Sequence, residues 1–138
     1  MSRDTSTGLR FEETAQTSTE GRDVSKHNLY RFLEERGIRW EDILSRKLLP
    51  DEAYWNENSK ALTVFEKKYQ QSEGSADEKP QTCGFKIAQF KKIGAALGAE
   101  EVTYTYIFND WFKQPKYKDM LDYILSVDGC AYLFSDEL

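Results

Sequence analysis

Three residues in the stretch 48–71 have types and spacing that suit chemistry: Asp51, Glu66 and Lys68. The stretch reads as two extended segments joined by a short polar turn at 56–59. Alternate side chains of a strand share a face, so Glu66 and Lys68 point to the same side of the second segment. If the turn closes an antiparallel hairpin, Asp51 folds back alongside Glu66. Two carboxylates and an ammonium group would then converge at one end of an apolar strand pair.

That grouping suits the hydrolysis of phosphodiester bonds. Mg²⁺ is a hard cation that one or two carboxylates hold together with substrate phosphate oxygens. When bound, it polarises a phosphoryl oxygen and lowers the pKa of an attacking water. A nearby lysine orients or deprotonates that water and offsets the charge that grows on the phosphate. A second interpretation stays open, in which Glu66 and Lys68 form a solvated strand end and Asp51 is a turn residue.

The elements that must position these residues follow in a regular order along the chain. The pattern predicts helices at 23–37, 83–97 and 117–127, strands at 101–108 and 130–134, and a short helical turn at 41–44 around the hairpin. This order predicts an α/β fold, with a central mixed β-sheet flanked by helices.

The helix at 83–97 carries the second group of candidate functional residues. Lys86, Gln89 and Lys92 are three residues apart and lie near one another on a helical face that carries positive charge and no acid. That face either contacts a DNA backbone or serves only solubility. The apolar stripe of the same helix is expected to contain Phe85, Ile87 or Ala88, Ile93, Ala96 and Leu97.

Length and composition favour a single globular domain. The chain has 138 residues, of which 39% are hydrophobic and 31% charged. Residues 1–22 are expected to be a polar, partly flexible segment and residues 23–138 the domain. No apolar run is long enough to span a membrane, and no signal sequence precedes the domain, so a cytoplasmic protein is expected. Two cysteines and one histidine exclude a Cys/His zinc site, and Cys83 and Cys130 are expected to be reduced core thiols.

The charge of the chain is unevenly distributed. A net charge of −5 argues against a general nucleic-acid binder. The stretch 60–92, however, has seven lysines against four acidic residues, a local charge of +3 that leaves −8 for the remainder. A modest basic region around the candidate site suits phosphate binding.

The pattern Pro50-Asp51, a spacer and then Glu66-x-Lys68 resembles the signature of the PD-(D/E)XK nuclease superfamily, which includes many type II restriction endonucleases. The likeness extends from about Gly8 over nearly the whole chain, through runs such as SKHNLYRFLEERGI and FEKKYQQ. It implies a restriction-endonuclease-like core and a Mg²⁺-dependent DNA endonuclease. That core order also implies one further strand, which is either short or lies within 40–49.

The resemblance also implies roles for particular residues. Asp51 and Glu66 would be metal ligands together with the backbone carbonyl of Lys67, and Lys68 would position the water or act as the base. Gln70, on the face of Glu66, would lie near the metal or the DNA. Many members add a glutamate from the first helix, and here four candidates stay open: Glu12, Glu13, Glu34 and Glu35.

The expected partner is double-stranded DNA, and a homodimer is expected because cutting both strands of a palindromic site needs two sites related by a two-fold axis. The helix at 23–37 is the candidate dimer interface. Two alternatives stay open. One is a catalytically silent binding or inhibitor protein of the same fold, which the net charge favours but the trio of Asp51, Glu66 and Lys68 does not. The other is a nuclease that acts on RNA or branched DNA.

Overall fold

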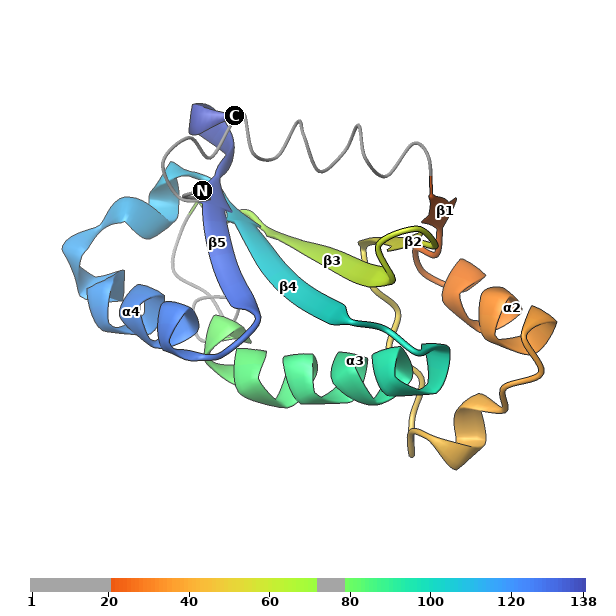
Figure 1. The fold of residues 1–138 in the computed structure, drawn as a ribbon. Helices are drawn as coiled ribbons and strands as arrows, with labels where there is room; N and C mark the ends of the chain where they lie inside the picture. Colours follow the sequence, from red (N-terminus) through yellow and green to blue (C-terminus); the bar gives the residue numbers. More distant parts are fainter. Residues whose placement is uncertain (1–20, 72–78) are drawn as a thin grey trace.

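The computed structural model describes residues 21–71 and 79–138, which form a mixed five-stranded sheet with helices packed against it (Figure 1). The antiparallel part of the sheet is formed by β1 (Arg22–Asp23), β2 (Glu52–Asn56) and β3 (Ala61–Lys68). β4 (Glu101–Phe108) and β5 (Cys130–Phe134) then follow parallel to β3. The strands lie side by side in sequence order. The α/β class and the mixed sheet expected from the sequence are therefore confirmed.

The main helices of the described residues are α2 (Asn28–Glu35), α3 (Cys83–Leu97) and α4 (Lys118–Ser126). The aromatic rings of Phe32 in α2 and Trp55 in β2 are 6.3 Å apart, and Phe90 in α3 stacks on Tyr104 in β4 at 5.6 Å. The strand register places Trp55 and Tyr104 on the same face of the sheet, so α2 and α3 cover that face together. Figure 1 shows α4 next to α3.

The buried stripe of α3 differs from the expected one. Phe85 is 63% exposed and Ala96 is also exposed. The buried side follows the helical spacing of three and four residues that begins at Cys83: Cys83, Ile87, Phe90, Gly94 and Leu97, with Ile93 beside them. The helical spacing therefore predicts which residues of α3 are buried better than the apolar character of Phe85 and Ala96 does. Gly94 lets α3 approach β4 closely, because a Cβ there would lie 2.5 Å from Val102 Cγ2.

The segment before the hairpin also differs from the expectation of one helix over 23–37. Arg22 and Asp23 form a short strand that pairs with β2, and the helix begins only at Asn28. The Ser25 hydroxyl, which precedes the helix, accepts a hydrogen bond from the Ala53 N–H of β2 at 3.0 Å. The additional strand is thus short, as one alternative held, but it precedes the helix. The segment 40–49 contributes a 3-10 helix at Trp40–Asp42 instead.

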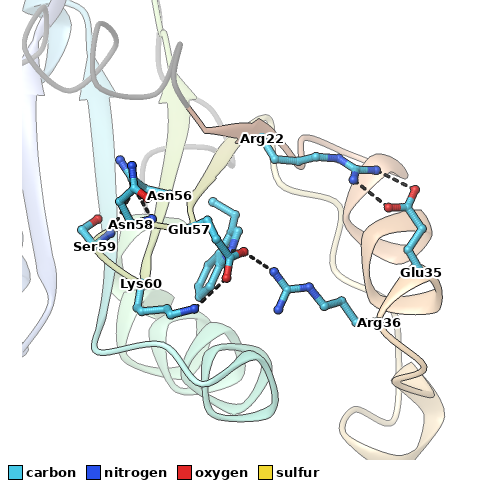
Figure 2. Close-up of polar contacts among 9 residues, drawn as sticks. Arg22, Glu35, Arg36, Asn56, Glu57, Asn58, Ser59 and Lys60 are labelled. Atoms are coloured by element: carbon cyan, nitrogen blue, oxygen red, sulfur yellow. Dashed lines mark hydrogen bonds and ion pairs between the residues drawn. The ribbon is translucent and has the colours of Figure 1, made fainter.

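The hairpin turn is tied to α2 by one carboxylate (Figure 2). Glu57 accepts hydrogen bonds from Lys60 Nζ at 2.6 Å and from Trp55 Nε1 at 2.8 Å, and it forms an ion pair with Arg36 at the end of α2. The hydrogen bonds from Lys60, Trp55 and Arg36 hold the pKa of Glu57 down at about 2. Within the turn, Asn56 Oδ1 accepts hydrogen bonds from the backbone N–H groups of Asn58 and Ser59. This confirms the polar turn predicted from the sequence.

We expect Glu57→Gln to lower the free energy of unfolding at neutral pH. The unfolded-state pKa of a glutamate is about 4.3, so this carboxylate contributes stability above that pH, and the contribution is lost as pH falls towards about 2. Denaturant unfolding of both proteins should therefore show a difference that shrinks between about pH 5 and pH 2. Glu34→Gln, at an exposed position of α2, is the control. A difference that is independent of pH would contradict the ion-pair explanation.

Candidate active site

The candidate site lies at the edge of the sheet where β3 ends. Because β3, β4 and β5 are parallel, their carboxyl ends meet at this edge. β2 is antiparallel to β3 and therefore begins here. The register pairs Glu52 with Phe65, so Asp51, the residue just before β2, comes opposite Glu66. The hairpin that the sequence predicted thus brings the two carboxylates to one place.

The side chain of Asp51 is held by the backbone of β3. The Lys67 N–H donates a hydrogen bond to Asp51 Oδ2 at 3.2 Å. The N–H and C=O groups of one strand residue point to the same side of the strand, so the Lys67 carbonyl faces the side on which Asp51 lies. The Lys67 side chain itself is exposed. The backbone of Lys67, rather than its ammonium group, therefore belongs to the site.

Glu66 and Lys68 lie together on the face of β3 that the helices cover. Their side chains are only 14% and 22% exposed, and Lys68 Nζ is 3.6 Å from Glu66 Oε2. The other oxygen of this carboxylate, Oε1, accepts a hydrogen bond from the Tyr104 hydroxyl at 3.2 Å. Burial strongly raises the pKa of Tyr104, so its hydroxyl remains protonated and donates. Glu66 is thus contacted by two side chains from two strands.

The electrostatic surroundings of Glu66 favour a bound cation. Burial raises the pKa of Glu66, and the nearby charge of Asp51 raises it further. Lys68, Lys86 and the hydrogen bond from Tyr104 act in the opposite direction without cancelling that rise. A divalent cation between the carboxylates would relieve both the burial of charge and the repulsion from Asp51. The donor set fits Mg²⁺, which accepts two carboxylates and a carbonyl and keeps several waters.

The second group of predicted residues is only partly brought to this place. Lys86 is half-buried in the first turn of α3, and its charge acts on Glu66. Lys92 is exposed and lies about 9 Å further along the helix axis. Gln89 lies between them and is half-buried. The described residues therefore place Lys86 beside the carboxylates and Lys92 further away along α3.

The glutamates of the first helix do not join the site. Glu35 forms a two-fold hydrogen-bonded ion pair with Arg22, at 2.6 and 2.7 Å. Glu34 precedes it on α2, whose end is tied to the hairpin turn through Arg36. The turn and Glu66 are at opposite ends of β3, about 16 Å apart at the rise of a strand. Both residues are thus excluded as partners of Asp51, while Glu12 and Glu13 lie outside the described residues.

Gln70 is held at the site by its backbone. Asn109, directly after β4, donates from Nδ2 to the Gln70 carbonyl at 2.6 Å and accepts from the Gln70 N–H at 3.1 Å. This pair of hydrogen bonds joins the chain leaving β3 to the chain leaving β4. Asn109 was not predicted from the sequence, where an asparagine after a strand indicates only a turn.

We expect Asn109→Ala to weaken both the fold and the site. Loss of two partly buried hydrogen bonds should lower the free energy of unfolding by about 1–3 kcal/mol. It should also loosen the position of Lys68, two residues before the clamped Gln70. Denaturant unfolding measures the first effect. The activity of the site measures the effect on Lys68. Its control is Asn56→Ala, which removes a side-chain acceptor in the hairpin turn at the other end of β3 and should leave any activity intact.

The remaining chemistry-bearing residues are elsewhere. Cys83 and Cys130 are buried free thiols, as expected, and burial raises the pKa of Cys130 to about 12. Among residues 21–71 and 79–138, no three His, Cys, Asp or Glu side chains gather as a metal cluster. In the same part of the chain, no helix has the length and apolar character needed to cross a membrane.

Comparisons with known proteins returned no relative. The chain matches no protein-family model, no curated protein and no solved structure.

Proposed function

We propose that this chain is a Mg²⁺-dependent endonuclease that hydrolyses phosphodiester bonds in double-stranded DNA. The observation that supports this most is the antiparallel register of β2 and β3, which sets Asp51 beside Glu66 on a strand that also carries Lys68. This chemistry requires two carboxylates and an ammonium group, which Asp51, Glu66 and Lys68 supply. The raised pKa of Glu66 shows that its charge lacks full compensation, which a cation would provide.

Each residue has a role in the proposed reaction. Asp51, Glu66 and the Lys67 carbonyl would hold the ion, which when bound polarises the phosphoryl oxygen and lowers the pKa of the attacking water. Lys68 would orient or deprotonate that water. Lys86, beside the same carboxylate, would offset negative charge on the phosphate. Gln70, just after β3, and Gln89 and Lys92 of α3 are proposed as DNA contacts.

The proposal extends to the fold family and the assembly. The antiparallel run β1–β2–β3, followed by α3 and the parallel strand β4, supports a restriction-endonuclease-like core, and a type II restriction-like activity is proposed with it. A homodimer is proposed because both strands of a duplex must be cut. The apolar side of α2 is buried within its own chain, through Leu29, Tyr30, Phe32 and Leu33. The dimer interface proposed for this helix would therefore use its charged side.

Cleavage of plasmid and phage DNA tests the proposal, with Mg²⁺ or with EDTA. We expect metal-dependent fragments from the wild type and none from Glu66→Ala or Lys68→Ala. A parallel assay on single-stranded RNA and branched DNA distinguishes the substrates. Absence of cleavage of every substrate by a folded protein that also binds no Mg²⁺ would contradict the proposal and favour a binding or inhibitor protein.

A further inference from the structure

Tyr104 is fixed at the centre of the sheet. Its side chain is fully buried. Its ring stacks on Phe90 of α3 at 5.6 Å and meets the edge of Tyr106 at 5.1 Å. The ring is therefore held from the helix layer and from its own strand. A buried tyrosine needs a partner for its hydroxyl, and here the hydroxyl donates to the Glu66 carboxylate and also hydrogen-bonds with the Tyr106 hydroxyl.

The hydrogen bond from Tyr104 divides the two oxygens of Glu66. Oε1 accepts from the hydroxyl at 3.2 Å, while Oε2 is the oxygen that lies 3.6 Å from Lys68 Nζ. A carboxylate with one oxygen held has lost the freedom to rotate about its last bond. Its second oxygen then stays on the side of Lys68.

We propose that Tyr104 is a positioning residue, which holds Oε1 of Glu66 and so orients the other oxygen, Oε2, to bind the divalent cation. This inference rests on the proposed function of Asp51 and Glu66 as the metal-binding pair. A group that hydrogen-bonds to a metal ligand fixes the orientation of that ligand before the metal binds, so less conformational entropy is lost on binding. Removal of such a group typically lowers metal affinity about 10- to 100-fold. Tyr104 would act on the metal through Glu66 and would not touch the substrate.

Tyr106 provides a closely matched control. It is on the same strand and the same face, is 1% exposed, and is the register partner of Glu66 in β4. The Tyr106 hydroxyl also hydrogen-bonds with the Tyr104 hydroxyl, but only Tyr104 donates to Glu66, so Tyr106→Phe leaves that hydrogen bond in place. Tyr104→Phe and Tyr106→Phe each remove one buried hydroxyl from the same layer, so a general effect on packing should be similar in both variants.

The test is a calorimetric titration of the full chain with Mg²⁺ without DNA, together with cleavage rates over a range of Mg²⁺ concentrations. We expect Tyr104→Phe to bind Mg²⁺ about 10- to 100-fold more weakly and to recover cleavage at saturating Mg²⁺. Tyr106→Phe should stay within about three-fold of the wild type, well inside that effect.

Two results would overturn the inference while leaving the metal site intact: wild-type affinity in Tyr104→Phe, or equal losses in both variants. If the wild type itself binds no Mg²⁺, the proposed function of the carboxylate pair fails, and the role of Tyr104 fails with it. The wild-type titration thus separates the two failures.

Discussion

Glu66→Gln is expected to abolish Mg²⁺-dependent cleavage and, in the metal-free protein, to raise the free energy of unfolding at neutral pH. Glutamine keeps the size of the side chain and an oxygen that can accept from Tyr104. It removes a charge that is largely buried and repelled by Asp51. Relief of that charge should stabilise the fold by about 0.5–2 kcal/mol, the range of single stabilising substitutions. A gain in stability with a loss of activity would mark Glu66 as a residue kept for function.

The pH dependence follows from the direction of the shift. The folded-state pKa of Glu66 is raised above its unfolded value. Stability associated with this group is therefore fully present below the unfolded-state pKa and is lost as pH rises through the folded-state pKa. The advantage of Glu66→Gln over the wild type should be largest near neutral pH and should disappear at low pH.

Added Mg²⁺ should reverse the order of the two proteins. A ligand at 100 times its dissociation constant stabilises the folded state by about 2.7 kcal/mol, and only the wild type should gain it. Denaturant unfolding with Mg²⁺ or EDTA measures both effects. Glu57→Gln, at the other end of the hairpin, is the contrasting control, because its carboxylate has a lowered pKa and its loss should destabilise at neutral pH. Equal responses of Glu66→Gln and wild type to Mg²⁺ would contradict the assignment of Glu66.

Lys68→Ala is expected to lower the rate of cleavage by about 10²–10⁴-fold, the contribution typical of a group that moves or orients a proton. Lys68 Nζ is 3.6 Å from Glu66 Oε2 in a largely buried position, so solvent cannot readily take its place. Mg²⁺ binding should persist in this variant, since both carboxylates remain. Single-turnover rates at saturating Mg²⁺ separate the chemical step from metal binding.

Lys91→Ala is the control for Lys68→Ala. It removes the same charge from α3, where Lys91 forms an exposed ion pair with Asp128 at 3.2 Å. Exposed pairs of this kind contribute little to stability, so the rate should stay close to that of the wild type. Similar losses in both variants would show that cleavage depends on overall charge rather than on the position of Lys68.

The hairpin, and the proximity of Asp51, Glu66 and Lys68 at its end, could be predicted because both depend on local rules. Alternation along a strand puts Glu66 and Lys68 on one face, and a short polar turn brings Asp51 back to them. These rules need no knowledge of the rest of the fold. The element types at 83–97, 101–108 and 130–134 were predictable for the same reason, because strong periodicity or β-branched composition marks them.

The contacts that depend on tertiary register could not be predicted. Tyr104 reaches Glu66 only because β4 pairs parallel to β3 in one particular register. The alternating tyrosines of the run EVTYTYIF indicated a shared face, but not the strand that would lie next to it. Asn109 required two strand ends to meet. The strand at Arg22–Asp23 is too short to produce a periodic signal, and the place of Glu34 and Glu35 depends on how α2 packs.

Asp51 and Glu66 are proposed to form a divalent-metal site for phosphodiester hydrolysis, and paramagnetic NMR with Mn²⁺ can locate such a site residue by residue. We expect substoichiometric Mn²⁺ to broaden the amide signals of Asp51, Glu66 and Lys67, EDTA to restore them, and Mg²⁺ to compete. The signals of the hairpin turn, at the other end of β3, should stay sharp. Broadening centred on any other group of residues, or no broadening at all, would contradict a metal site at Asp51 and Glu66.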